Sequence, residues 1–240
     1  MPDYLLIIIG IIAGYLLGAF PSGWVAARLT RGIDLRRYGT GGIGLSNTWH
    51  AVHSLRVVVP VALLDIVKVM PAVWWASFVG LDLAWLVVIG FCGIIGHNWP
   101  VYLGFHGGRG MLATVGFAFI VPVASGLVPW PLIGGLVVLF VTIAVIHNSA
   151  VAVFLAIATP QFISLGVGEP LPLLLAMVAI FLMMVFRRLV QPRAGIAAAL
   201  PWRQILFYRF FFDRDIKDRE LWVKRQPEAA ASKPAGQERH

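Results

Sequence analysis

The sequence predicts an all-α membrane protein: a polytopic bundle of about seven transmembrane helices, with its N-terminus outside, its C-terminus inside and glycine-rich loops on the cytoplasmic side. The prediction rests on composition, on long apolar runs and on where the charges lie. Of 240 residues, 59% are hydrophobic and 12% are charged, and the mean hydropathy is +0.84. Soluble domains have about 25% charged residues. This composition therefore excludes a water-soluble enzyme, a disordered protein and a disulfide scaffold.

The apolar runs give the number of helices, since a transmembrane helix needs about 20 mostly apolar residues. Three of the runs are short and Pro160 interrupts the sixth, so six and eight helices are the alternatives to seven. The first run lacks the positively charged start of a signal peptide and is expected to remain as a helix. The runs are Tyr4–Ala27, Val57–Val79, Leu83–Gly96, Leu112–Leu127, Leu132–Ile146, Val151–Val167 and Leu171–Val185.

The charges predict the orientation, because Lys and Arg accumulate in cytoplasmic loops. With the N-terminus outside, the outer segments carry only the acids Asp3, Asp82 and Glu169. All Lys and Arg then lie inside, except Lys68 within the second run. The active face is therefore expected to be cytoplasmic, and the net charge of +8 indicates anionic lipid and not nucleic acid as a partner.

The composition changes after the last run. We expect a membrane domain over residues 1–193, a basic, aromatic cytoplasmic segment over 194–225 and a disordered tail over 226–240. Trp202 to Phe212 interleaves aromatic residues with Arg203 and Arg209, a pattern typical of a helix lying on an anionic membrane surface.

Two loops on the predicted inner face carry residues suited to phosphate. The first has four glycines within residues 39–44, with hydroxyl groups beside them and Arg36 and Arg37 preceding them. Such a backbone presents several N–H groups to an oxyanion, although a flexible turn is the alternative. The second has Gly107-Gly108-Arg109-Gly110 directly before an apolar helix, whose N-terminus attracts anions.

Few other groups indicate chemistry. Asp65 and Lys68 share a helix face within the second run, either as a structural ion pair or as a contact with substrate. His97 is a candidate general base or a capping residue. The remaining histidines form no metal-ligand pattern, so we expect neither a metal nor a cofactor. The His-x-x-x-x-Asp and G-x-S-x-G patterns are absent, which disfavours a covalent acyl-enzyme.

Four segments resemble the bacterial membrane acyl-phosphate:glycerol-3-phosphate acyltransferase (PlsY) family. GHNWPVYLGFHGGRGMLATVG, residues 96–116, resembles the family's GHxxPvfxxFkGGKGVATxxG. RGIDLRRYGTGGIGLSNTW is similar to GxDlRxxGSGNxGaTNv, LDIVKVMPA to lDxlKGxxPa, and GAFPSGWVAARL to GSIPFGxxiaKL. The resemblance covers residues 5–116, and the later runs agree in hydropathy only.

The sequence departs from these motifs at several places. Ala19 replaces a serine, Gly42 an asparagine, His50 an arginine and Arg109 a lysine. The family's C-terminal HxENIxRLxxGtE motif is missing, and Phe186 to Arg193 stands in its place. The basic residues of this stretch, Arg187 and Arg188, are candidates to replace the motif.

The resemblance implies transfer of a fatty acyl group from acyl phosphate to the sn-1 hydroxyl of glycerol 3-phosphate, giving lysophosphatidic acid in the cell membrane. It also implies a soluble enzyme that supplies acyl phosphate. The alternative is a divergent relative that binds or transports a phosphorylated solute or phospholipid without acyl transfer. The expected catalytic residues are His97, Arg109 and Ser46, and the expected phosphate-binding residues are Arg36, Gly39, Thr40, Gly41, Gly44, Asn47, Lys68, Gly107, Gly108, Gly110 and Thr114.

Overall fold

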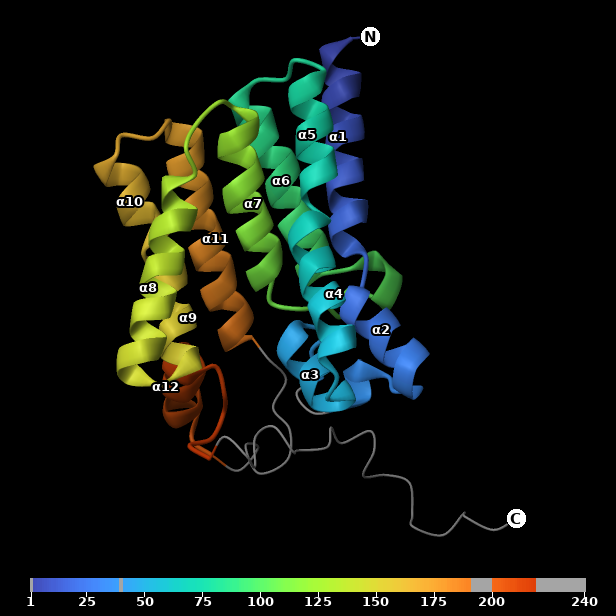
Figure 1. Ribbon diagram of the computed structural model, residues 1–240, viewed down its shortest axis with the longest axis vertical. Coiled ribbons are helices and arrows are strands. Elements are labelled where there is room, and N and C mark those ends of the chain that lie inside the picture. The colour runs from blue at the N-terminus through green and yellow to red at the C-terminus, as the bar shows by residue number, and fades with distance from the viewer. Residues whose placement is uncertain (1, 39–40, 191–199, 219–240) are drawn as a thin grey trace.

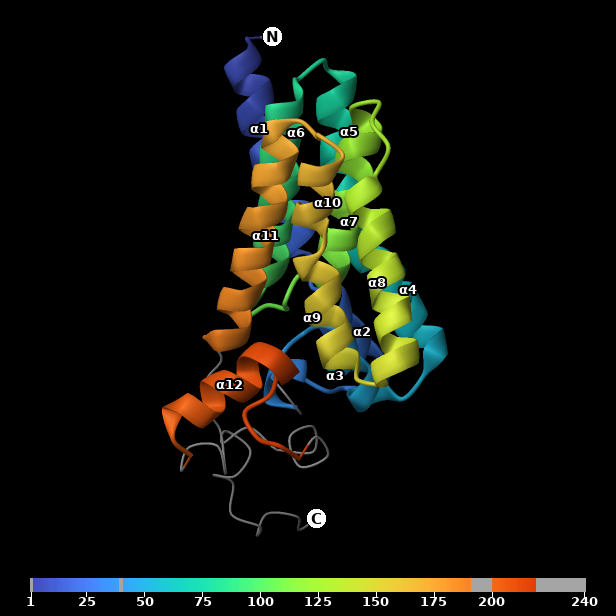
Figure 2. The same cartoon turned by 90° about the vertical axis from the view of Figure 1, so that its left-hand side faces the viewer.

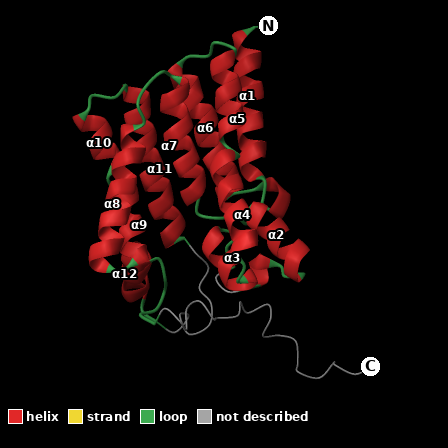
Figure 3. Ribbon diagram, viewed as in Figure 1, coloured by secondary structure: helices red, strands yellow, loops and turns green. Residues whose placement is uncertain are grey.

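The computed structural model describes residues 2–38, 41–190 and 200–218. Every regular element in these ranges is a helix, and the long helices stand side by side in one bundle (Figures 1 and 3). The helices are α1 Asp3–Ala19, α2 Ser22–Arg31, η1 Leu35–Arg37, α3 Leu45–Val52, α4 Leu55–Val67, α5 Met70–Phe78, α6 Leu83–Asn98, η2 Val101–Leu103, α7 Met111–Ala124, α8 Trp130–Ile146, α9 Ser149–Ala158, α10 Pro160–Gly166, α11 Leu171–Leu189 and α12 Trp202–Phe212.

The spans follow the apolar runs. Among the described residues, five helical stretches are long and apolar enough to cross a membrane: Asp3–Arg31, Leu55–Phe78, Leu83–Leu103, Ser149–Gly166 and Leu171–Leu189. The shorter apolar helices α7 and α8 correspond to the other two runs. Large apolar side chains face outward, as lipid contact requires. The prediction of a polytopic all-α membrane bundle is confirmed, with five helical stretches of spanning length and two shorter apolar helices among the described residues.

Prolines interrupt three of the spans. Pro21 precedes α2, Pro71 lies in the first turn of α5, and Pro160 begins α10. Because proline has no N–H and its ring clashes with the preceding turn, a helix breaks or kinks there. The interruption at Pro160 was predicted. The breaks between α1 and α2 and between α4 and α5 were not predicted, because each lies inside one of the predicted apolar runs.

The closest packing joins α1 to α6. Gly10, Gly14 and Gly18 recur every four residues on the buried face of α1. A Cβ at Gly14 would lie 2.5 Å from the carbonyl oxygen of Ile89, and one at Gly18 would overlap the backbone of Gly93. Small residues at this spacing let two membrane helices approach closely. The contact brings the C-terminal end of α6 beside the junction between α1 and α2.

The C-terminal helix α12 has the bounds that its aromatic pattern predicts. It lies obliquely across one end of the bundle, below α9 and α11 (Figure 2). Its location at a membrane surface stays a prediction, although Trp202, Phe207 and Phe211 expose large apolar areas. The boundary expected after residue 193 and the tail 226–240 lie outside the described residues.

Charge separates along the bundle. Both glycine-rich loops and α12 lie at one end, whereas the N-terminus and the α5–α6, α7–α8 and α10–α11 connections lie at the other (Figure 1). Asp3, Asp82 and Glu169 belong to the second end, where the Asp82 carboxylate accepts the N–H groups of Ala84 and Trp85 and caps α6. The basic end is therefore where the predicted phosphate-binding loops meet.

Candidate active site

The second glycine-rich loop lies directly against the C-terminal end of α6. The Gly108 N–H donates to the His97 carbonyl at 3.1 Å. A Cβ at Gly107 would overlap the carbonyl oxygens of His97 and Asn98, and one at Gly108 would overlap His97 Nε2. Gly110, at φ +75°, adopts the left-handed conformation and precedes α7. The glycines therefore permit this close packing of the loop on α6. Arg109 is the one residue of the Gly107–Gly110 stretch that carries a side chain.

Arg109 precedes the first turn of α7, whose N-cap residue, Gly110, provides no side-chain hydrogen bond. A helix N-terminus of this kind favours anions through its N–H groups and its dipole. The Arg109 side chain is 36% exposed and forms an ion pair with Asp213, which directly follows α12. An arginine at a helix N-terminus provides a cationic site for an oxyanion.

Arg187, in the last turn of α11, reaches the same loop. Its Nη2 donates to the carbonyl of Gly108 at 2.9 Å, and its guanidinium carbon lies 5.0 Å from the centroid of the Trp99 ring. Arg188, its neighbour, instead donates to the carbonyl of Phe210 in α12. The sequence offered both arginines as replacements for the missing C-terminal motif, and the structure brings only Arg187 to the loop.

Two side chains in this region have buried polar atoms without a hydrogen-bond partner among the described residues. Asn98 is fully buried, and neither its amide nitrogen nor its oxygen is paired. Thr114 Oγ1, in the first turn of α7, is also unpaired. Buried polar groups are normally satisfied, so unpaired ones beside an arginine favour a polar ligand at this place. The sequence predicted Thr114 as a phosphate-binding residue but did not predict Asn98. The indication for Asn98 was its position next to His97 at the C-terminal end of α6.

A buried polar chain connects this loop to the second span. Lys68 Nζ lies 2.8 Å from Asp65 Oδ1, 2.7 Å from His97 Nδ1 and 3.1 Å from the carbonyl oxygen of Phe20. Ser22 Oγ donates to Asp65 Oδ1 at 2.6 Å. The structural ion pair between Asp65 and Lys68 is confirmed. A direct contact of Lys68 with substrate stays a prediction.

The chain also determines what His97 can do. A lysine paired with a carboxylate is an ammonium group and only donates, so His97 Nδ1 is the acceptor. Nε2 then carries the proton, and it faces Gly108. In this tautomer the ring offers a hydrogen-bond donor to the loop. The geometry therefore favours an electrophilic role for His97 over the general-base role that the sequence suggested.

The first glycine-rich loop is organised by Asn47. Its Nδ2 donates to the carbonyls of Leu35, Tyr38 and Gly42 at 3.1, 2.9 and 2.7 Å. Asn47 is buried, so the amide supports the loop from inside, whereas Ser46 is exposed in the first turn of α3. The hydroxyl of Ser46, and not the amide of Asn47, is thus available to a ligand.

Other predicted residues of the first loop lie nearby. Gly44 precedes α3, and Gly41 has φ +74°. Arg36 pairs with Asp34 at 2.8 Å. This hydrogen-bonded pair lowers the pKa of Asp34 to about 2 and raises that of Arg36. Gly39 and Thr40 lie outside the described residues.

Two adjacent residues at the start of α2 link both loops. Ser22 binds Asp65 of the polar chain, and Gly23 packs against the carbonyl of Ile43 and the Thr48 hydroxyl. The structure therefore brings His97, Lys68, Thr114 and the Gly107–Gly110 stretch together, and places Arg36, Gly41, Gly44, Ser46 and Asn47 in a second cluster at the same end. Their roles stay predictions. Within the described ranges, no three His, Cys, Asp or Glu side chains converge as metal ligands.

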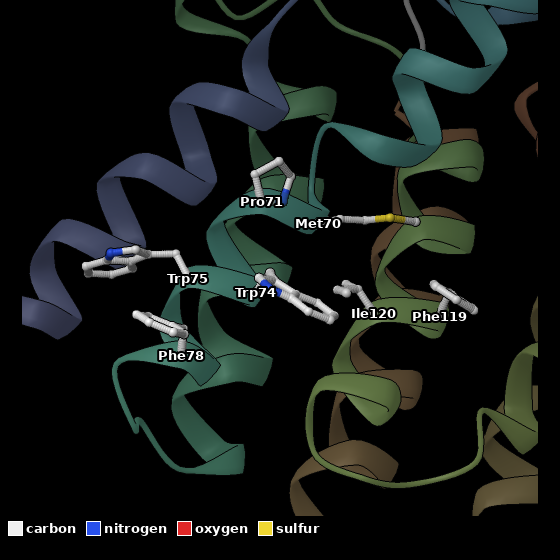
Figure 4. Close-up of a pocket in the computed structure, with 7 residues that line it drawn as sticks. All are labelled: Met70, Pro71, Trp74, Trp75, Phe78, Phe119 and Ile120. Atoms are coloured by element: carbon white, nitrogen blue, oxygen red, sulfur yellow. The ribbon is translucent and has the colours of Figure 1, made fainter.

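An apolar groove of about 550 Å³ lies between α5 and α7 (Figure 4). Its polar content is negligible, and Trp74 and Phe78 on its rim are largely exposed. Met70, at one end, is two residues from Lys68. The lining residues are Met70, Pro71, Trp74, Trp75, Phe78, Phe119 and Ile120.

These features define a helical integral membrane protein with a cationic, glycine-lined site at one end of its bundle. The family model for glycerol-3-phosphate acyltransferases matches residues 8–200. The chain therefore belongs to the glycerol-3-phosphate acyltransferase family.

Individual relatives agree. Glycerol-3-phosphate acyltransferase 5 of Dehalococcoides mccartyi is 36% identical and covers 96% of this chain and 98% of its own length. Glycerol-3-phosphate acyltransferase 4 of another strain is 33% identical over 92% of this chain and 95% of its own. The crystal structure of PlsY (YgiH) in its glycerol 3-phosphate form has a TM-score of 0.67 and 27% identity, and covers 79% of this chain and 96% of that chain.

Proposed function

We propose that this membrane glycerol-3-phosphate acyltransferase takes its acyl group from acyl phosphate and transfers it to the sn-1 hydroxyl of glycerol 3-phosphate. The hydroxyl oxygen attacks the acyl carbon, the carbon–oxygen bond to phosphate breaks, and the phosphate leaves with the electron pair. The hydroxyl proton goes to phosphate. The products are lysophosphatidate and inorganic phosphate.

The observation that carries this proposal is the convergence of cationic and donor groups on one loop. Arg187 Nη2 and His97 Nε2 lie against Gly108, the next residue is Arg109, and the unpaired Asn98 amide lies against Gly110. Such a set binds phosphate and stabilises the charge that develops on it as it leaves. Because acyl phosphate already has a good leaving group, positioning and charge stabilisation supply most of the catalysis.

We assign the second phosphorylated substrate, glycerol 3-phosphate, to the first glycine-rich loop. Gly41 and Gly44 allow a close approach of the backbone, Ser46 provides an exposed hydroxyl, and Arg36, paired with Asp34, is the nearby guanidinium. Two phosphorylated substrates need two anion-binding loops, and both loops lie at the same end of the bundle (Figure 1). The polar chain through Ser22 and Asp65 sets their relative position.

The acyl chain is assigned to the groove between α5 and α7. Its walls are apolar and open toward the surface that faces lipid. Met70 lies close in sequence to the polar chain, so the acyl group enters the site from within the bilayer while its phosphate stays with Arg109.

The site is assigned to the cytoplasmic face. The end that carries both loops also carries the arginines of α2, η1, α11 and α12, whereas Asp3, Asp82 and Glu169 belong to the opposite end. The positive-inside rule then places the N-terminus outside and the C-terminus inside. This face is accessible to a soluble enzyme that supplies acyl phosphate.

Purified protein in lipid vesicles, given acyl phosphate and radiolabelled glycerol 3-phosphate, tests the reaction. Wild type is expected to form labelled lysophosphatidate, and Arg109→Ala is expected to reduce kcat/KM at least ten-fold. Arg56→Ala is the matched control, since Arg56 is an exposed arginine of α4 at the same end. No product above background with wild type, or equal rates for wild type and Arg109→Ala, would contradict the proposal.

A further inference from the structure

The C-terminal segment supplies a carboxylate to the phosphate site. Asp213 forms an ion pair with Arg109, which is 104 residues earlier in the chain. The Asp213 side chain is only 16% exposed, and its Oδ1 is buried without a hydrogen-bond partner among the described residues. A carboxylate thus lies on the guanidinium that the proposed function assigns to substrate phosphate.

The position of Asp213 is held by contacts that do not involve Arg109. The buried guanidinium of Arg209 donates to both carboxylate oxygens of Asp215, at 2.5 and 3.1 Å, and to the carbonyl of Leu189 at 2.6 Å. Arg188 donates to the carbonyl of Phe210 at 3.2 Å, and the rings of Phe154 and Phe210 are 5.0 Å apart. These contacts fasten α12 to α9 and α11.

This carboxylate lies beyond the part of the chain that the family model describes. The model ends at residue 200, before α12 begins. The Dehalococcoides acyltransferase 5 covers 96% of the chain, so its similarity includes α12. The ion pair therefore joins a residue of the family's glycine-rich signature to a segment that the family model does not include.

We propose that Asp213 is an internal competitor for substrate phosphate at Arg109. Carboxylate and phosphate oxygens are both charged acceptors for a guanidinium. Without substrate, Asp213 occupies Arg109, and the substrate phosphate displaces it. A phosphate dianion, with more charge and more acceptor oxygens than a carboxylate, competes well, whereas a carboxylate ligand has no advantage. The ion pair between Arg109 and Asp213 therefore lowers the affinity of the site for phosphate and favours phosphate over carboxylate ligands. This inference rests on the proposed role of Arg109.

Reconstituted full-length protein tests the competition by the KM of each substrate and the inhibition constant of inorganic phosphate. Asp213→Asn is expected to lower the phosphate inhibition constant and the KM of the substrate bound at Arg109 by about five-fold, the lower range of typical coupling between sites. Because the proposed function assigns the phosphate of acyl phosphate to Arg109, the KM of acyl phosphate is expected to fall and that of glycerol 3-phosphate to stay unchanged. Asp213→Glu keeps the charge and is expected to keep the wild-type constants.

Asp3→Asn is the control, because it removes the same charge from an exposed residue at the opposite end of the bundle and is expected to change none of these constants. Asp215→Asn is a second variant. It removes the ion pair of Asp215 with Arg209 and leaves Arg109 and Asp213 unchanged, and it is expected to lower the same constants. Unchanged or raised constants in both Asp213→Asn and Asp215→Asn would overturn the inference.

The role of Arg109 is tested separately. In an Arg109→Ala background, Asp213→Asn is expected to have no further effect, since the two changes then act on one interaction. If Arg109→Ala leaves every KM unchanged, the proposed phosphate site itself is wrong. If it raises a KM while Asp213→Asn changes nothing, the site stands and only the competition is wrong.

Discussion

Lys68 Nζ lies 2.7 Å from His97 Nδ1, although the two residues belong to different membrane spans. The contact makes Nδ1 an acceptor and leaves the Nε2–H of His97 facing Gly108. The ion pair between Asp65 and Lys68 therefore orients the Nε2–H of His97 toward the loop that carries Arg109.

Removing either charge of this pair is expected to reduce both stability and activity. Lys68→Met leaves Asp65 buried without its cation, and Asp65→Asn leaves Lys68 without its anion. Breaking a buried pair in this way typically costs about 3–5 kcal/mol. We expect a large drop in the thermal midpoint in detergent and at least a ten-fold loss of kcat for each variant.

The double variant Lys68→Met/Asp65→Leu separates the two effects. Removing both charges recovers much of the stability, but His97 still lacks its donor at Nδ1. We therefore expect near wild-type thermal midpoints with kcat still reduced. Recovery of kcat together with stability would show that the pair has only a structural role.

Gly108→Ala is expected to reduce kcat/KM about 100-fold, because displacements near 1 Å in an active site have effects of this size. The added Cβ would overlap His97 Nε2, so either the loop or the ring has to move. Gly166→Ala is the matched control, since no atom lies within 4 Å of a Cβ there. Equal kinetics for wild type and Gly108→Ala would show that Nε2 is not directed at a bound ligand.

The Asp34–Arg36 pair predicts a stability change at low pH only. The pKa of Asp34 is lowered to about 2 by its hydrogen bonds with Arg36. A lowered carboxyl pKa stabilises the fold above the unfolded-state value near 3.9, and this contribution disappears as the pH falls toward 2. Carbon-13 NMR of labelled aspartate is expected to show the Asp34 carboxyl titrating near 2, and Arg36→Gln is expected to return its pKa toward 4. A titration unchanged by Arg36→Gln would disprove the assignment.

Filling the apolar groove is expected to shorten the preferred acyl chain. Phe119→Trp adds bulk between α5 and α7 at a partly exposed position of the groove, so rates with long acyl phosphates fall while rates with short ones persist. Phe140→Trp, on an exposed face of α8, is the matched control. The measurement is the ratio of kcat/KM values across acyl phosphates of increasing length. An unchanged ratio in Phe119→Trp would place the acyl chain elsewhere.

Local patterns in the sequence predicted most of the fold. Apolar runs located the spans because lipid requires backbone groups to pair within a helix, and the aromatic pattern gave the bounds of α12. The break between α4 and α5 was missed, because Pro71 lies within a run whose hydropathy does not fall. The helix α3 was expected as loop, since four glycines precede it closely.

The candidate site was predicted less completely, because its contacts join distant residues. The hydrogen bond from Arg187 to Gly108 spans 79 residues, and the pair between Arg109 and Asp213 spans 104. Nothing in a single sequence sets such distances. The glycines of the second loop were interpreted as a phosphate cradle, whereas the structure shows that they first of all allow the loop to pack on α6.

The central claim is that Arg109 and Arg187 bind a substrate phosphate. Calorimetric titration of glycerol 3-phosphate and of a non-transferable acyl phosphonate into the reconstituted protein tests it most directly. The variant Arg109→Ala/Arg187→Ala is expected to lose at least ten-fold in affinity for the acyl phosphonate, while Arg56→Ala keeps the affinity for both ligands. Binding of both ligands to the double variant with wild-type affinity would contradict the account.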